Sequence, residues 1–435
     1  MSDAPHIRVL AIMGSGETSP TMVTIHKALT ARLGTGSHGA ILLDTPYAFQ
    51  ENASDISARS QAYFARSVGL TVTVVSDADL PAAQNPAAAG ALAAIRSSDW
   101  VFAGPGSPSY ALNRWRGGAV AEALRDRIAA GTGLTVIASA AAAATGFVAV
   151  PVYEIYKVGA DPHWLDGLDL FGVLGLKVAV IPHYDNAEGG THDTRFCYLG
   201  ERRLAVLERE LPADAAVLGV DEHTALILDL VAQEAEVVGR GGATVRKLGV
   251  STVLQAGSRI TLPDLRLMVR SGSPAPGHPG HAGPGLAGQD EPQERPRAAP
   301  SQPGQALSEV TSDAEGRFEA AVRERDGATM VSAILDLEAA IEAWSTDTDE
   351  NDSADRARAV LRGLVVRLGR TAEQGLADPA DQLRPAVEPL VTLREDLRRE
   401  RSYAAADVIR EALTAAGVEL QDSPDGTSWA VSSAR

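Results

Sequence analysis

Short apolar runs that alternate with helical stretches constrain the fold of this chain most. Segments between the runs, such as 57–68 and 87–96, carry apolar residues at helical spacing. This alternation is typical of an α/β fold in which helices cover both faces of a mostly parallel, doubly wound sheet. Ligands bind beyond the carboxyl ends of the strands in such sheets. The expected strands are 7–13, 40–43, 71–75, 99–103, 134–137, 177–181 and 216–220.

The pattern changes further along the chain. Short strands joined by glycine turns over 226–268 predict a small antiparallel extension of the first domain, which we place at 1–270. Residues 271–305 are rich in Pro, Gly and Gln, which predicts a disordered linker. Residues 306–435 predict a separate helical domain, with helical spacing over 317–344, 354–368 and 385–416 and a short tail at its end.

Composition excludes several classes of function. The 435 residues carry a formal net charge of −17, so a broad surface for nucleic acid is not expected. A single cysteine, Cys197, excludes an intrachain disulfide and a zinc site with several cysteines. No signal-peptide layout and no apolar run of transmembrane length occur, so we expect a cytoplasmic protein without membrane contact. Homo-oligomerisation stays open.

Residues 134–146, LTVIASAAAAATG, form a buried strand that turns into a helix, with Ser139 at the turn. Hydrolases expose a nucleophilic hydroxyl at such a turn, and the first helical N–H groups lie close by for a developing oxyanion. The small alanines allow the backbone to double back. A serine at this position is also typical of an ordinary helix N-cap, and this alternative stays open.

Other segments follow strands and can converge on Ser139. Two of them are glycine-rich loops, whose backbone N–H groups can approach an anion, although ordinary βα turns look the same. The candidate oxyanion and substrate-binding residues are Gly104, Gly106, Ala140, Gly14 and Gly16. Glu154 is an acid flanked by Tyr153, Ile155 and Tyr156, and His183 follows the strand 177–181.

A hydroxyl, a base and an acid in this chain order match the needs of nucleophilic catalysis. The base takes the proton of the hydroxyl, and the acid orients the base. Ser139, His183 and Glu154 supply the three types, and Asp185 is the alternative acid because it lies close to His183 in the same loop. This arrangement predicts a serine-type hydrolase that needs no cofactor.

The loop after His183 also permits metal chemistry. Hard or borderline ligands crowd this loop: His183, Asp185, Glu188, His192 and Asp193. Such side chains hold zinc or manganese in other proteins, so a metal-dependent hydrolase stays an alternative, although no HExxH spacing is present.

Several motifs together resemble the peptidase S51 group, which includes dipeptidase E and cyanophycinase and belongs with the class I glutamine amidotransferase-like folds. The resemblance covers about 9–230. It rests on GSGE at 14–17, AGPGSPSYAL at 103–112, SAAAAATG at 139–146, IPHYDN at 181–186 and GVDEHTALIL at 219–228. Their order and spacing make the combination specific.

The resemblance implies that Ser139 attacks a peptide or amide bond of a small substrate, with acidic molecules among the candidates. It implies His183 as the base and Glu154 as the acid, and it gives the pair Asp221–Glu222 a structural or substrate-orienting role. Two family glycines beside the serine are Ile137 and Ala141 here, so a non-catalytic binding or regulatory protein is the alternative.

The C-terminal part, about 315–430, resembles the helical end of cysteinyl-tRNA synthetase. The matching positions are Arg394, Arg398, Asp407, Arg410, Gly426, Thr427 and Trp429. In the synthetase this region helps to recognise tRNA, which implies a weak tRNA contact here. HIGH-like and KMSKS-like segments are missing from the sequence, so we expect no aminoacyl-tRNA synthetase activity.

Overall fold

The computed structural model describes residues 7–34, 38–80, 86–131, 133–189, 192–272, 305–345, 347, 353–374, 379–423 and 426–432. The chain divides into two units. The first comprises Met1–Ala306 with Ala343–Asp352, and the second comprises Leu307–Glu342 with Ser353–Arg435. Most of the segment for which we expect a linker, 273–304, lies outside the described residues. Among the described residues, no helix is both long enough and apolar enough to cross a bilayer.

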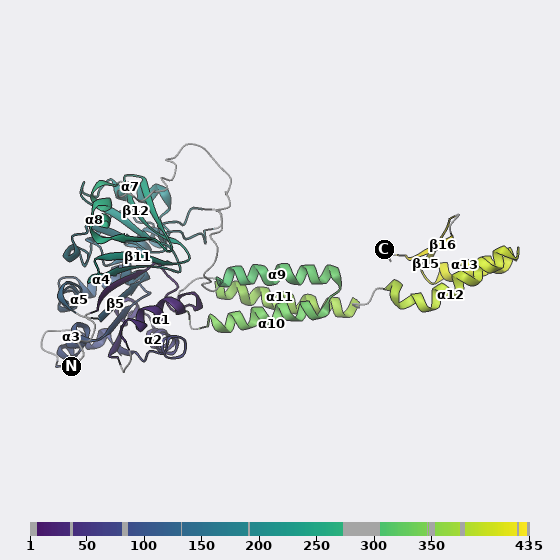
Figure 1. Ribbon diagram of the computed structural model, residues 1–435, viewed down its shortest axis with the longest axis horizontal. Coiled ribbons are helices and arrows are strands. Elements are labelled where there is room, and N and C mark those ends of the chain that lie inside the picture. The colour runs from purple at the N-terminus through teal and green to yellow at the C-terminus, as the bar shows by residue number, and fades with distance from the viewer. Residues whose placement is uncertain are drawn as a thin grey trace. The chain divides into compact units, whose positions relative to one another are not determined.

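An eight-stranded sheet forms the centre of the first unit (Figure 1). The strand order is β14-β11-β10-β1-β5-β4-β2-β3, and the strands from β1 to β3 in this order run parallel. Its strands are β1 (Arg8–Met13), β2 (Ala40–Leu43), β3 (Thr73–Val75), β4 (Trp100–Ala103), β5 (Gly133–Ala138), β10 (Thr224–Asp229), β11 (Glu234–Gly239) and β14 (Arg259–Thr261). The doubly wound α/β fold expected from the sequence is therefore confirmed.

A second sheet of six strands continues the unit. Its order is β13-β12-β9-β8-β6-β7, with β6, β8 and β9 parallel. The strands are β6 (Val148–Ala149), β7 (Leu165–Asp166), β8 (Val178–Ile181), β9 (Ala216–Val220), β12 (Gly242–Lys247) and β13 (Val250–Gln255). The antiparallel strands expected over 226–268 extend both sheets, because β10 pairs with β1 and β12 pairs with β9.

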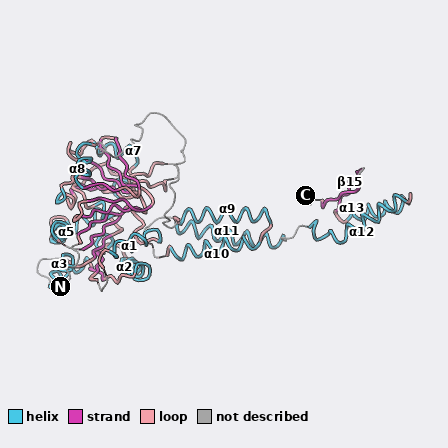
Figure 2. The backbone as a smooth tube through the Cα atoms, viewed as in Figure 1, coloured by secondary structure: helices cyan, strands magenta, loops and turns pink. Residues whose placement is uncertain are grey.

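Helices cover both faces of the larger sheet, as the alternation of buried side chains requires. Leu10 and Ile12 of β1 lie in one apolar core, whereas Val9 and Ala11 lie in the other. Figure 2 shows the strands in magenta enclosed by helices in cyan. The helices of this unit are α1 (Val23–Ala31), α2 (Ala53–Tyr63), α3 (Pro86–Ser97), α4 (Pro108–Trp115), α5 (Ala119–Ala130), α6 (Ser139–Ala143), α7 (Gly200–Glu208) and α8 (Leu262–Ser271).

The second unit contains helices, as expected, and a hairpin that we did not expect. The helices are α9 (Leu307–Glu324), α10 (Gly327–Ala343), α11 (Ser353–Gln374), α12 (Pro379–Arg399) and α13 (Tyr403–Ala415). The stretch expected as one helix over 317–344 is broken at Arg325, whose φ is +55°, and Asp326 caps α10 by accepting the N–H groups of Ala328 and Thr329.

The C-terminal tail forms a β-hairpin, β15 (Val418–Ser423) with β16 (Gly426–Val431). Alternating apolar residues, Val418 and Leu420, bury one face of β15 against α12 and α13. The short tail that the sequence predicted is thus an ordered element of the second unit.

Candidate active site

Ser139 lies where β5 turns into α6. Its φ is +46°, a left-handed conformation that a side chain disfavours and that a tight strand-to-helix turn requires. The N–H of Ala141 donates to the carbonyl oxygen of Gly104 (3.1 Å) and fixes the start of α6. Ile137, which replaces a family glycine, points into the core at 2% exposure, so its branched side chain does not crowd the turn.

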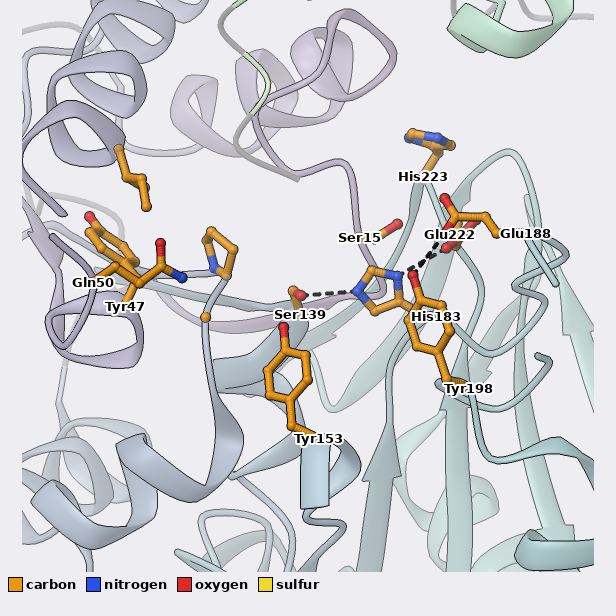
Figure 3. Close-up of a pocket in the computed structure, with 13 residues that line it drawn as sticks. Ser15, Tyr47, Gln50, Ser139, Tyr153, His183, Glu188, Tyr198, Glu222 and His223 are labelled. Atoms are coloured by element: carbon orange, nitrogen blue, oxygen red, sulfur yellow. Dashed lines mark hydrogen bonds and ion pairs between the residues drawn. The ribbon is translucent and has the colours of Figure 1, made fainter. Parts of the chain in front are cut away.

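His183 follows β8 and faces Ser139. The distance from Ser139 Oγ to His183 Nε2 is 3.0 Å, within hydrogen-bond reach (Figure 3). His183 also has a left-handed φ, +47°, and its carbonyl oxygen accepts the N–H of Cys197. The structure therefore brings together the hydroxyl and the imidazole on which the sequence analysis centred.

Glu222 is the acid that contacts His183. It follows β9, and its Oε1 lies 2.9 Å from His183 Nδ1. Burial raises the pKa of this carboxyl, but the hydrogen bond and positive charge of His183, together with Asn186, outweigh burial and lower the pKa to about 2. An ionised carboxylate only accepts, so Nδ1 carries the proton and Nε2 is left to accept from Ser139.

The two acids that the sequence analysis proposed lie elsewhere. Glu154 begins a short π-helical turn, η5 (Glu154–Val158), and no hydrogen-bond partner of its buried Oε2 occurs among the described residues. Asp185 accepts the backbone N–H of Glu222 at 2.7 Å with its Oδ1. The expected contact of Glu154 with His183 is thus replaced by Glu222, because β8 and β9 are neighbouring parallel strands whose ends meet.

Two of the candidate oxyanion residues line the site. Gly106 and Ala140 border the cavity at Ser139, and among the described residues no backbone partner is recorded for either N–H. Gly106 has a φ of +131°, and a Cβ there would lie 2.1 Å from the carbonyl oxygen of Pro46, so only glycine fits. These two amides are the candidates for stabilising an oxyanion.

The other three glycines are placed differently. The carbonyl oxygen of Gly104 is engaged by Ala141, and the N–H of Gly14 donates to Thr224 (3.0 Å). Gly16 lies against the ring of His223, which a Cβ would overlap at 2.2 Å. None of these three glycines lines either cavity at Ser139.

Ser139 lines two cavities that share part of their lining, and Figure 3 shows the residues of one of them. The shared side chains include Tyr153, His183, Glu188 and Tyr198. One cavity extends to Ser15, Tyr47, Gln50, Ile56, Pro105, Glu222 and His223, and the other extends to Val152, Tyr156, Lys157, His192, Thr194 and Cys197. The two cavities therefore leave room for a small molecule on either side of the Ser139 hydroxyl.

The loop side chains considered as metal ligands have other partners. Glu188 accepts from the Tyr198 hydroxyl at 2.8 Å, and Asp193 pairs with Arg195 at 2.8 Å. His192 Nε2 lies 3.5 Å from the Tyr156 hydroxyl. Within the described ranges, no three His, Cys, Asp or Glu side chains group as metal ligands do.

Several of the synthetase-like positions in the second unit hold the hairpin on α12. Arg394, which is 1% exposed, binds both carboxylate oxygens of Asp422 at 2.8 Å. Arg398 contacts the same carboxylate at 2.5 Å, and the Thr427 hydroxyl donates to it at 2.9 Å. The hydrogen bonds from Arg394, followed by those from Thr427 and Arg398, lower the pKa of Asp422 well below its usual range.

Comparison with curated proteins supports the C-terminal resemblance. The chain is similar to a cysteine–tRNA ligase from Proteus mirabilis (strain HI4320), at 38% identity over 106 residues, which is 22% of each chain. A cysteine–tRNA ligase from Nocardioides sp. (strain ATCC BAA-499 / JS614) is 34% identical over 111 residues, 25% of this chain and 19% of that one. The chain thus spans about a fifth of the length of these ligases.

Two solved structures to which this chain is similar are those of a peptidase and of a candidate peptidase. A peptidase from an acI-B1 Actinobacterium gives a TM-score of 0.47 at 19% identity, covering 59% of this chain and 98% of that one. A candidate peptidase E protein from Listeria monocytogenes EGD-e gives a TM-score of 0.36 at 17% identity, covering 54% and 98%. No family model matches the chain.

Proposed function

We propose that the first unit is a serine-type hydrolase of a peptide or amide bond in a small substrate. The observation that carries the proposal is the hydrogen-bonded chain from Ser139 through His183 to Glu222, with distances of 3.0 and 2.9 Å. Acidic molecules are among the candidate substrates, as the resemblance to the S51 group implies.

The proposed steps follow from this geometry. His183 Nε2 takes the proton of Ser139 as its oxygen attacks the carbonyl carbon, and the imidazolium then gives the proton to the leaving nitrogen. Glu222 holds the tautomer and stabilises the imidazolium. In the proposed mechanism the N–H groups of Gly106 and Ala140, which both line the cavity at Ser139, stabilise the oxyanion. Water repeats the same steps to release the acyl group.

A fluorophosphonate probe tests the nucleophile without knowledge of the substrate. The probe should label the full chain at Ser139, because an activated serine attacks phosphorus as it attacks an acyl carbon. Ser139→Ala should abolish labelling, whereas Ser109→Ala, a change at a serine outside the triad that is also buried, should not.

Two outcomes contradict the proposal. Labelling that survives Ser139→Ala, mapped by mass spectrometry to another residue, would assign the reactive group elsewhere. An unlabelled wild-type chain that is folded by circular dichroism would favour the non-catalytic binding protein.

A further inference from the structure

One oxygen of Glu222 receives two hydrogen bonds. Oε1 accepts from His183 Nδ1 at 2.9 Å and from the side-chain amide of Asn186, Nδ2, at 3.0 Å. Both donors come from the loop after β8, whereas Glu222 follows β9. Asn186 is therefore a second donor to the same Glu222 oxygen that accepts from His183.

The amide of Asn186 is held by its surroundings. Its side chain is buried at 1% exposure, and its Oδ1 accepts the N–H of Glu188 at 3.3 Å. Since the amide oxygen faces an N–H group, the NH₂ group must face the carboxylate. Its backbone carbonyl accepts from the Thr194 hydroxyl at 3.4 Å, and its own N–H donates to the carbonyl of His183 at 3.2 Å.

The tight turn from His183 to Asn186 thus carries the base and a donor for its acid. A glutamate has rotatable bonds that let its carboxylate swing away from a single partner. Because both donors come from one rigid turn, the Glu222 carboxylate can accept from both of them in only one orientation. Asp185, between them, adds an anchor by accepting the backbone N–H of Glu222 at 2.7 Å.

We propose that Asn186 is a positioning residue of the hydrolase, which shares the Oε1 oxygen of Glu222 with His183 and so fixes the carboxylate toward the imidazole. This inference rests on the proposed function. Asn186 does not itself line either cavity, and its side chain contacts Glu222, so it acts on the base through that carboxylate.

A second effect is electrostatic. The NH₂ group of Asn186 hydrogen-bonds the Oε1 oxygen of Glu222 and partly compensates its negative charge. The carboxylate therefore stabilises a protonated His183 less than it would without this donor. Titratable groups that face His183 from the surrounding elements are Glu222 and His223 after β9, Asp185 and Glu188 in its own loop, Cys197 and Tyr198 in the following turn, and Ser139 with Tyr153 across the cavity. Apart from the carboxylate of Glu222, loss of the donor alone should leave the placement of these groups unchanged.

The test uses the pH dependence of fluorophosphonate labelling at Ser139 in the full chain. The rate falls at low pH when His183 becomes protonated, which defines an acid limb. In Asn186→Asp, a carboxylate of the same size replaces the donor, so the imidazolium is stabilised and the acid limb should move to higher pH. Asn186→Leu removes the donor without adding charge, so its limb should move in the same direction by less.

The rate on the plateau should also fall in both variants. Loss of a group that orients a functional residue through a hydrogen bond lowers activity by about 10- to 100-fold in other systems. Asn113→Leu is the matched control, because Asn113 is exposed on α4 and lines neither cavity. It should keep both the wild-type rate and the wild-type acid limb.

Each outcome decides one point. A slower variant with an unmoved acid limb would give Asn186 a merely structural role and overturn the inference, as would wild-type rates in both variants. If Asn186→Leu does not fold, Asn186→Asp decides alone, since it keeps the acceptor for the Glu188 N–H. An unlabelled wild type, or labelling that persists in Ser139→Ala, overturns the proposed function itself and this inference with it.

Discussion

Ser139 and His183 both hold backbone conformations that their own side chains disfavour. Their φ angles are +46° and +47°, and such conformations cost about 1–3 kcal/mol each in residues other than glycine. They persist because the neighbouring elements fix them: Gly104 accepts from the turn after Ser139, and Cys197 donates to the carbonyl of His183. Strain of this kind collects at functional sites, which agrees with the proposed role of both residues.

Glu222→Gln should lower the fluorophosphonate labelling rate by orders of magnitude, about 10⁴-fold if it behaves as acid-to-amide changes at serine triads do. The amide loses the charge that stabilises the imidazolium and can present its NH₂ group to Nδ1. Glu154→Gln is the matched control and should change the rate by less than about threefold, since Glu154 does not line either cavity. A larger loss of labelling rate in Glu154→Gln than in Glu222→Gln would assign the role of the acid to Glu154, as the sequence predicts.

The sequence could anticipate the meeting of Ser139 and His183, because each follows a recognisable apolar strand. The acid that the sequence favoured, Glu154, is not the carboxylate that contacts His183, and the difference has a physical reason. The resemblance to the S51 group and the apolar neighbours of Glu154 favour this residue. Which acid contacts His183, however, depends on how the strands pair in the folded chain. The useful signal was present: Glu222 follows the strand 216–220, the next expected strand after the one that precedes His183, and consecutive strands are usually neighbours.

At the scale of elements, the pairing of β8 with β9 builds the site. Ile181 is level with Gly219 in this parallel pair, so the loops that carry His183 and Glu222 emerge side by side. The ring of Tyr184 lies directly on Gly219, where a Cβ would meet its Cδ2 at 2.3 Å. Tyr184 follows His183, so close contact at this glycine sets the position of the base.

Gly219→Ala should destabilise the protein by about 1–3 kcal/mol, the range for inserting a methyl group into a packed core. The displaced Tyr184 should also slow labelling at Ser139. Chemical denaturation followed by circular dichroism gives the free energy of unfolding. Gly90→Ala in α3 is the control, because a Cβ there meets nothing within 4 Å and alanine favours a helix. Equal stability of the two variants would show that Tyr184 moves aside at no cost.

The whole chain combines an acidic sequence with a C-terminal part similar to tRNA ligases. The resemblance implies tRNA contact, but Arg394 and Arg398 are engaged by Asp422 and hold the hairpin. The net charge of −17 opposes a polyanion at long range. The remaining basic residues therefore support at most a weak contact.

Full-length protein should bind unmodified tRNA weakly in a filter-binding assay at low salt, and the binding should weaken steeply as salt rises, since phosphate contacts release counterions. Arg410→Gln, a change at an exposed position of α13 that lies 3.9 Å from the Asp422 carboxylate and is half exposed, should reduce the binding, whereas Arg96→Gln in α3 should leave it unchanged. Absence of binding at the lowest salt would remove the tRNA prediction.

The sequence predicted the class of the whole fold but not its division into sheets. Runs such as 40–43 and 216–220 match β2 and β9 because buried parallel strands are continuously apolar. The assignment of β8 and β9 to a second sheet depends on pairing partners far along the chain, such as β12. The hairpin of the C-terminal tail was not expected, although Val418 and Leu420 alternate with polar residues as in a half-buried strand.

This division into sheets separates the parts of the proposed machinery. The nucleophile follows β5 in the larger sheet, whereas the base, the acid and Asn186 all follow strands of the smaller one. The hydrogen bond between Ser139 and His183 therefore joins a residue that follows the larger sheet to a residue that follows the smaller one. If Ser139 is the nucleophile, a movement of one sheet relative to the other that lengthens this hydrogen bond would separate the hydroxyl from its base, so labelling at Ser139 should depend on the relative position of the two sheets.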